Sequence, residues 1–341
     1  MTTPFDPASL SMTEIIRLQT LLSQELTRRF ERDLALVFTD IVDSTRYFAQ
    51  FGDEAGHRLQ RLHFDLIAQH LAANLGRVVN TAGDGAFLCF PSATQAAGAA
   101  VELQRAISAA NRDRARVHQL SVRIGMHWGP VLTDGDLVTG DSVNLCARIA
   151  ATAQPSQIRM SRELFQQLTP ALRDGCRAVE SVPLKGIARA VELMEIPWRD
   201  GARFPSQIII HESGERITLP PLDILCFGRG ELHNTLSIHD VVLTLPDPTA
   251  SKQISRRHFE LLSRPEGYVI KALSTQPTEV DGVVIQRDQE LPLHPGSLVR
   301  LARVMTLEFI SPVQGQATST DETMMSTGMG RRVPGDTQFV Q

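Results

Sequence analysis

The sequence is poor in cysteine and has none of the cysteine spacings that mark common sites. Its four cysteines are scattered over 341 residues, with no Cys-x-x-Cys pair and no Cys/His spacing of the metal-binding kind. Structural zinc sites need clustered thiolates and imidazoles, and disulfide frameworks belong to short secreted chains. We therefore expect reduced thiols that pack as small hydrophobic side chains. They are Cys89, Cys146, Cys176 and Cys226.

Long hydrophobic runs and an excess of positive charge are also missing. No apolar run approaches the roughly 18 residues that cross a bilayer, and the N-terminus lacks a basic segment followed by an apolar core. We therefore expect a cytoplasmic protein with no membrane partner. The net charge of -4 argues against a nucleic-acid-binding protein with a broad basic face. The local cluster of Arg112, Arg114 and Arg116 is predicted to be a solvated loop after a helix.

Length and composition suit two globular domains and a tail. With 42% hydrophobic and 21% charged residues, the chain has enough apolar material for ordinary cores. Proline, glycine and charged residues interrupt the periodic pattern near residues 197–205, as an interdomain linker would. The predicted division is a helical segment at 1–31, a first domain at 32–198, a linker at 199–205, a second domain at 206–311 and a disordered tail at 312–341.

Alternating helix and strand patterns predict an α+β first domain. The predicted elements are a strand at 34–39, a helix at 53–74, a hairpin at 77–90, a helix at 93–110 and a strand at 120–128. In the second domain, short β-type runs recur between turn signals without a long helix. That pattern predicts an all-β sandwich.

An amphipathic helix is predicted ahead of the first domain. Ile15, Leu18, Leu22 and Leu26 recur at steps of three and four residues within 11–30. Two interpretations are equally open. The helix packs on its own domain, or it forms a short parallel pair with a second copy at a dimer seam.

Two aspartates stand at the ends of predicted strands. Asp40 follows a buried-strand run, and Asp84 lies at the tip of a hairpin. Mg²⁺ is usually held by one or two carboxylates together with substrate phosphates. Further along, Asn144 and Arg148 share one helix face, where they suit a sugar hydroxyl and a phosphoryl group. Singly, each residue has a plain structural explanation as a turn, a cap or a solvated face. Together they indicate nucleotide chemistry.

In these motifs the chain resembles the class III nucleotide cyclases over about residues 32–196. The matching segments are Phe38-Thr-Asp-Ile-Val-Asp-Ser-Thr45, Ala82-Gly-Asp-Gly85, Arg123-Ile-Gly-Met-His-Trp-Gly129, Val143-Asn-Leu-Cys-Ala-Arg148 and Leu184-Lys-Gly186. The resemblance implies a ferredoxin-like catalytic domain that converts ATP or GTP into a cyclic 3′,5′-nucleotide and pyrophosphate. It also implies a homodimer, in which the aspartates come from one protomer and the Asn/Arg pair from the other.

The same resemblance implies roles for individual residues. Two Mg²⁺ or Mn²⁺ ions would be held by Asp40, Asp84 and the backbone carbonyl of Ile41. Asn144 would orient the ribose, and Arg148 would stabilise charge at the α-phosphate. The implied phosphate contacts are the backbone amides at Val42, Asp43, Ser44 and Thr45, and Lys185, for which a surface or packing role is equally open.

Two base-reading positions depart from the purine-specific cyclases. The family's lysine is replaced by Asn80, and its aspartate or threonine by Leu137, with Asp136 one residue off register. Asn80 can still donate and accept hydrogen bonds, whereas Leu137 cannot, so base selection is expected to be loose or to rest on backbone groups. An alternative therefore stays open: a weak or inactive cyclase-fold scaffold whose main role is protein binding through the second domain.

The second domain resembles the forkhead-associated (FHA) domain over about residues 206–311. The matching segments are Phe227-Gly-Arg229, Ser255-Arg-Arg-His258 and Val280-Asp-Gly282. The resemblance implies a phosphothreonine-binding site, in which charge-assisted hydrogen bonds hold the phosphate. The implied contacts are Arg229, Ser255, Arg256, Thr275 and Gln276. Gln276 stands where the family has an asparagine, which leaves the sequence preference of the site open.

The tail offers one possible ligand for that site. Thr323 lies in the acidic segment 321–325. Once phosphorylated, it would reach Arg229 and Ser255 in the same chain or in a dimer partner at high effective concentration. An inert tail is the competing interpretation, and a phosphothreonine-containing protein is the alternative partner.

Overall fold

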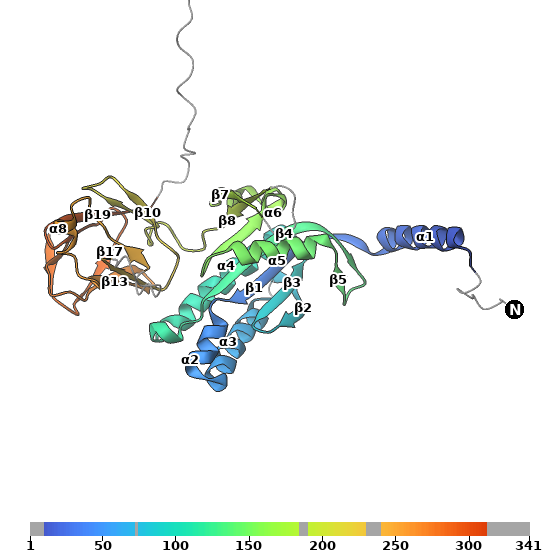
Figure 1. Ribbon diagram of the computed structural model, residues 1–341, viewed down its shortest axis with the longest axis horizontal. Helices are drawn as coiled ribbons and strands as arrows, with labels where there is room; N and C mark the ends of the chain where they lie inside the picture. The colour runs from blue at the N-terminus through green and yellow to red at the C-terminus, as the bar shows by residue number, and fades with distance from the viewer. Residues whose placement is uncertain (1–9, 72–73, 184–189, 230–239, 312–341) are drawn as a thin grey trace, which may run out of the picture.

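The computed structural model describes residues 10–71, 74–183, 190–229 and 240–311 (Figure 1). Lys185, the tail from residue 312 and Thr323 lie outside these ranges, so their predictions stay untested. None of the helices in the described ranges has the length and apolar character needed to span a bilayer.

A sheet with helices on both faces forms the first domain. Its strands are β1 (Glu31–Ile41), β2 (Arg77–Ala82), β3 (Gly85–Phe90), β4 (Val122–Thr133), β5 (Val138–Thr139), β6 (Ile158–Ser161), β7 (Arg177–Val182) and β8 (Val191–Glu195). Its helices are α1 (Met12–Phe30), α2 (Ser44–Phe51), α3 (Asp53–Leu71), α4 (Ala93–Asn111), α5 (Asp141–Thr152), α6 (Arg162–Gln167) and α7 (Pro170–Arg173), with a short 3-10 turn η3 (Arg116–His118). The strand order β2-β3-β1-β4 with antiparallel neighbours confirms the ferredoxin-like α+β prediction.

Strand β1 shows how an apolar run builds two cores. Successive side chains of a strand point to opposite faces of the sheet. Ala35 and Val37 therefore pack with α3 and α4 on one face, while Leu36 joins the cluster with α5 on the other. Gly125 on β4 allows this close approach, because a Cβ there would lie 2.2 Å from the backbone nitrogen of Ala150 on α5. Helix α5 is thus held directly against the sheet.

Helix α1 carries a complete capping box and an uncovered apolar face. The Ser11 side chain accepts from the Glu14 amide, and the Glu14 carboxylate accepts from the Ser11 amide. No residue of α1 is buried, and Leu22 is 56% exposed. In Figure 1 the helix extends away from the sheet at the end opposite the second domain. The helix contacts β1 and β4 of its own domain, but these contacts bury none of its residues, so they do not cover its apolar face. The dimer seam stays a prediction.

The second domain is the predicted β-sandwich. Its elements are β9 (Gln207–Ile210), β10 (Arg216–Thr218), β11 (Ile224–Gly228), β12 (Val241–Val242), α8 (Pro248–Ser251), β13 (Phe259–Arg264), β14 (Gly267–Ala272), β15 (Thr278–Val280), β16 (Val283–Ile285), β17 (Glu290–Leu293), β18 (Leu298–Leu301) and β19 (Met305–Ile310). One sheet has the order β10-β9-β19-β18-β15-β16 and the other β12-β11-β13-β14-β17. Phe227, Phe259 and Phe309 pack between them in one buried cluster.

The predicted linker is packed between the domains. The Arg199 guanidinium lies 4.4 Å from the ring centroid of Trp198, which belongs to the first core, and 5.6 Å from that of Tyr268 in the second. It also donates to Asp223 at 2.7 Å. Both side chains are about nine-tenths buried, at 9% and 10% exposure. The junction is therefore a specific contact and not a loose spacer.

The arginine cluster after α4 is exposed, as predicted for a solvated loop, and one of its members also has a partner. The guanidinium of Arg116 pairs with Asp240 of the second domain at 2.7 Å. The prediction of a solvated loop was therefore incomplete for Arg116. The sequence could not show this partner, since the two residues are 124 positions apart.

Candidate functional site

The two aspartates end neighbouring strands of the central sheet. Strands β1 and β3 are antiparallel, and their register pairs Thr39 with Ala86. Asp40 is the next residue on β1, and Asp84 lies just before β3 in the hairpin turn. The fold therefore brings the two predicted carboxylates to the same end of the sheet.

Asp40 is paired with an arginine that the sequence prediction did not assign to the site. Register places Asp40 opposite Arg123 on β4, and both Nε and Nη2 of Arg123 donate to Asp40 Oδ2, at 2.8 and 2.6 Å. The two bonds fall on one oxygen, so Oδ1 of the carboxylate takes no part in them. Arg123 stood in a recognised motif, but only strand pairing reveals that it faces Asp40.

Asp84 is held by a buried histidine. His63 on α3 is 0% exposed, and its Nδ1 lies 3.0 Å from the carbonyl oxygen of Asp84. Burial lowers the pKa of His63 to about 4, so near neutral pH the ring is uncharged and its Nδ1–H donates to that carbonyl. Nothing in the sequence pattern marked His63, because its role arises from the packing of α3 under the hairpin.

The donor set fits a hard divalent cation. Oδ2 of Asp84 is buried without a hydrogen-bond partner in the described structure, an arrangement that is costly for a carboxylate unless another group satisfies it. Two carboxylates and the Ile41 carbonyl offer only oxygen ligands, which Mg²⁺ and Mn²⁺ prefer. No cluster of three or more His, Cys, Asp or Glu side chains suited to a metal occurs among the described residues. A cation here would therefore rely on substrate oxygens as well.

The turn after Asp40 leads directly into helix α2. Asp43 adopts a left-handed conformation with φ of 57°, which turns the chain from the strand into the helix. The Val42 amide donates to the Ser121 carbonyl at 2.9 Å, so this predicted phosphate contact is already used. The amides of Ser44 and Thr45 belong to the first helical turn and have no intrahelical acceptor. They are the better placed phosphate donors of the predicted set.

The two base-reading positions line the same cavity as Asp40. This open cavity has a volume of about 490 Å³, and its walls include Asp40, Asn80, Arg123 and Leu137. A bulge in β2 between Val78 and Asn80 re-aims the strand next to the cavity. Leu137 is 62% exposed there and presents no polar group from its side chain. The structure therefore brings together the carboxylate predicted to bind metal and the residues expected beside a base.

The predicted phosphopeptide residues of the second domain also converge. The Arg229 amide donates to the Ser255 carbonyl at 3.0 Å, and the hydroxyls of Ser255 and Ser274 lie 2.6 Å apart. Ser274 Oγ in turn accepts from the Gln276 amide at 2.8 Å. Arg256, Thr275 and Gln276 are exposed around this cluster. These exposed residues lie on one rim of the sandwich.

Gly228 and His258 support this rim from below. A Cβ at Gly228 would lie 1.8 Å from the Arg256 carbonyl oxygen, so only glycine lets the two backbones approach. His258 is fully buried, and its Nδ1 accepts from the Ser255 amide at 3.1 Å. Sequence reasoning singled out both residues as parts of motifs.

Comparison with known families separates the chain into two recognisable parts. A family model described as the adenylate and guanylate cyclase catalytic domain matches residues 28–194, and a model described as the FHA domain matches residues 225–302. The chain contains a cyclase catalytic domain followed by an FHA domain. The prediction of these two domains, in this order, is confirmed.

Individual relatives match the cyclase domain. An adenylate cyclase of Lachancea kluyveri is 30% identical over 179 residues, covering 46% of this chain and 10% of that protein. An adenylate cyclase of Podospora anserina is 31% identical over 162 residues, covering 41% of this chain and 8% of that protein. A solved adenylate/guanylate cyclase/hydrolase from Silicibacter pomeroyi is 25% identical with a TM-score of 0.45, covering 49% of this chain and 96% of that one. This chain thus spans a tenth or less of the length of these two curated relatives.

In the cyclase domain, Asn144 and Arg148 lie away from the Asp40 cavity. Helix α5 lines that cavity with Val143, Ala147, Ala150 and Ala151. Asn144 is exposed and Arg148 partly so, and neither side chain forms a hydrogen bond or ion pair with another described residue. One chain therefore does not assemble the four predicted residues around a single cavity.

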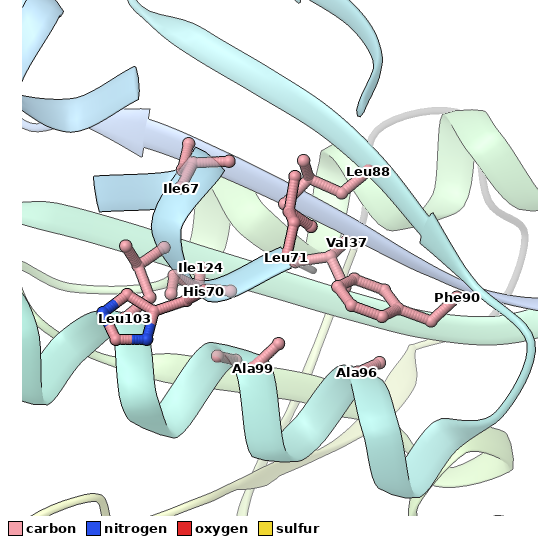
Figure 2. Close-up of a pocket in the computed structure, with 11 residues that line it drawn as sticks. Val37, Ile67, His70, Leu71, Leu88, Phe90, Ala96, Ala99, Leu103 and Ile124 are labelled. Carbon is pink, nitrogen blue, oxygen red and sulfur yellow. The ribbon is translucent and has the colours of Figure 1, made fainter. Parts of the chain in front are cut away.

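A second cavity lies on the opposite face of the cyclase sheet and is unsuited to a nucleotide. Figure 2 shows it between α3, α4 and the strands, with the side chains of Val37, Ile67 and Phe90 in its wall. Its volume is about 20 Å³, little more than the space of one water molecule. Its lining is almost wholly apolar. It is a packing defect of the core and not a binding site.

Proposed function

We propose that this protein is a homodimeric nucleotide cyclase that converts ATP or GTP into a cyclic 3′,5′-nucleotide and pyrophosphate, and that its FHA domain binds a phosphothreonine segment. The observation that carries the proposal is the pair of carboxylates at the ends of β1 and β3, with a partnerless Asp84 oxygen and a nucleotide-sized cavity beside Asp40.

The chemistry needs cation-binding oxygens, phosphate donors and a positive charge at the reacting phosphate. Two Mg²⁺ or Mn²⁺ ions held by Asp40, Asp84 and the Ile41 carbonyl would lower the pKa of the ribose 3′-hydroxyl and neutralise the triphosphate. The 3′-oxygen forms a bond to the α-phosphorus as the bond to the β-phosphate oxygen breaks, the hydroxyl proton passing to solvent. The Ser44 and Thr45 amides hold phosphate oxygens at the start of α2. Arg123, released from Asp40, lies in the same cavity wall and offers its guanidinium to the phosphates.

The second copy supplies the remaining groups. Asn144 and Arg148 project from α5 away from their own chain's cavity, so they serve the site of the partner chain. There Asn144 orients the ribose and Arg148 stabilises charge at the α-phosphate. A twofold dimer repeats this exchange at both sites.

Base selection by this site is weak. Asn80 supplies one amide to the base edge, while Leu137 offers only an apolar surface to it. This same feature favours the second candidate function, a scaffold that has lost catalysis and acts through the FHA domain. The two functions differ in a single measurable property, which is the metal-dependent formation of cyclic product.

Activity of the full chain tests the proposal. The chain is incubated with ATP and with GTP, in Mg²⁺ and in Mn²⁺, next to Asp40→Asn. The matched control is Asp33→Asn, which removes an exposed carboxylate from the same strand. We expect cyclic product from the wild type and from the control, and none from Asp40→Asn. Absence of product from the wild type in every condition refutes the cyclase and leaves the scaffold.

Complementation tests the shared site. Asp40→Asn and Arg148→Ala are each inactive alone, but mixed chains form dimers in which one of the two sites has both residues. An equal mixture is expected to regain about a quarter of the wild-type activity, because half of its dimers are mixed and each has one intact site. No recovery in a mixture whose chains demonstrably exchange would show that each chain builds its own site.

A further inference from the structure

Two carboxylates of the FHA domain reach the cyclase domain at one segment. This segment, residues 111–121, connects α4 to β4 and includes η3. Asp223 binds its first residue, Asn111, at 2.8 Å, and Asp240 binds Arg116 at 2.7 Å. Ser108 of α4 also donates to Asp223. The FHA domain therefore contacts segment 111–121 at two residues, Asn111 and Arg116.

The Asp223 contact is linked by further hydrogen bonds to the turn 41–45, which follows Asp40. Asn111 is 2% exposed, and its amide exchanges two hydrogen bonds of 2.8 Å with the backbone of Leu120. The next residue, Ser121, accepts the Val42 amide at 2.9 Å through its carbonyl. Asp223 thus holds the Asn111 side chain, and Asn111 holds the backbone of Leu120 just before β4. The adjacent Ser121 is bonded to Val42 in the turn after Asp40.

The Asp240 contact reaches the same turn from its other side. Two residues after Arg116, the His118 Nδ1 lies 3.0 Å from the Tyr47 hydroxyl on α2. The rings of His118 and Phe51 lie 4.8 Å apart, which adds an aromatic contact to the same helix. The Tyr47 backbone amide donates a hydrogen bond to the Asp43 carbonyl. The two routes therefore end on Val42 and Asp43, the two residues that follow Asp40 and Ile41.

We infer that Asp223 and Asp240 are positioning residues for the cyclase site, which hold the turn 41–45 in place through segment 111–121. The inference rests on the proposed function only for its effect on catalysis. Neither carboxylate touches substrate. Their action is to restrict the first turn of α2 and the metal-binding end of β1, where small displacements alter the alignment of reacting atoms.

The same carboxylate of Asp240 is bonded to the FHA strand next to the phosphopeptide cluster. Its Oδ2 accepts the Cys226 amide at 2.8 Å, while Oδ1 takes Arg116. Cys226 lies on β11, which ends one residue before Arg229. Asp240 therefore joins the strand that carries Arg229 to the segment that supports the turn.

The test uses the full chain with Asp223→Asn and Asp240→Asn, which remove charge and keep shape. The matched control is Glu308→Gln, which removes a carboxylate from an exposed FHA pair with His211. Amide exchange of residues 43–51 is followed by mass spectrometry. We expect it to rise about tenfold in the two aspartate variants and to stay unchanged in the control. Arg116→Gln, which removes the cyclase-side partner of Asp240 and leaves its bond with the Cys226 amide, is expected to raise the exchange as Asp240→Asn does.

Turnover at saturating nucleotide is measured on the same proteins. We expect kcat to fall about tenfold in both aspartate variants and in Arg116→Gln, and to stay unchanged in Glu308→Gln. Exchange of residues 43–51 that stays at the wild-type rate, while segment 111–121 or the domain contact loosens, overturns the inference. Faster exchange with unchanged kcat overturns it as well. A wild type without cyclic product refutes the proposed function, and the exchange of residues 43–51 still decides whether the two carboxylates hold the turn.

Discussion

Acidification is expected to weaken the FHA domain through His258. This side chain is 0% exposed, and its Nδ1 accepts the Ser255 amide at 3.1 Å. Burial lowers the pKa of His258 to about 4, from an ordinary value of 6.5. A protonated Nδ1 has no lone pair for the Ser255 amide, so protonation breaks the bond that supports the loop at Ser255.

The sign and size of the effect follow from these two pKa values. Between about pH 6.5 and pH 4 the unfolded chain binds a proton at His258 and the folded domain does not, so its stability falls as the pH falls. A difference of about 2.5 between the two pKa values corresponds to about 3 kcal/mol at 1.36 kcal/mol each. The stabilisation is fully present above about pH 6.5 and is lost by about pH 4.

Amide exchange of the full chain measures this loss where it occurs. Both tryptophans belong to the cyclase domain, so their fluorescence does not report on the sandwich. Peptides from β11, β13 and β14 are followed from about pH 7 to about pH 4, after correction for the intrinsic exchange rate. His258→Asn keeps an acceptor for the Ser255 amide but does not titrate. His211→Asn removes an exposed histidine of the same domain as a control.

We expect the wild type and His211→Asn to lose about 3 kcal/mol of opening free energy on acidification, and His258→Asn to lose far less. Equal pH slopes in the wild type and His258→Asn would refute the reasoning.

Three further outcomes follow from the cyclase domain. Gly125→Ala is expected to destabilise the full chain by about 3 kcal/mol in denaturant titrations, because the new methyl group meets the backbone at Ala150; an unchanged midpoint would contradict this packing. His63→Asn, which keeps a donor for the Asp84 carbonyl, is expected to retain more Mn²⁺ affinity than His63→Leu in calorimetric titrations, and equal affinities would contradict the assigned role. Asn80→Lys is expected to raise the ratio of ATP to GTP turnover about tenfold, and an unchanged ratio would show that this position does not read the base.

Local patterns were enough to predict the main elements of the first domain and the all-β class of the second. The apolar run from residue 34 places its side chains alternately on the two covered faces of the sheet. A short, continuous apolar run of this kind is typical of a central strand. The predicted helix at 53–74 corresponds to α3, but α2 was not predicted as a separate element. Its eight residues are too few for a clear periodic signal, and the left-handed Asp43 before it is not visible in a pattern.

In the candidate site, too, local sequence patterns predicted some residues, and only the fold revealed the others. Asp40 and Asp84 were predictable because each follows a strand signal within a few residues. His63 and Arg123 were not assigned, because each acts on an aspartate that is distant in sequence, at separations of 21 and 83 residues. Their relation depends on register and helix packing, which a one-dimensional pattern does not contain.

The domain contact is the strongest case of this limit, and its energetics follow from burial. Ser108 and Asp223 are 115 positions apart, and each taken alone resembles an ordinary surface residue. Burying Asp223 to 10% exposure costs several kcal/mol unless partners replace its water, and here Arg199, Ser108 and Asn111 do so. The Arg199–Asp223 pair adds little net stability over an apolar contact, but loss of Arg199 leaves a buried carboxylate without an opposite charge, which is strongly destabilising. Such a contact selects one relative position of the two domains more than it strengthens their association. A fixed relative position is what Asp223 needs if it is to hold the turn 41–45 of the neighbouring domain in place.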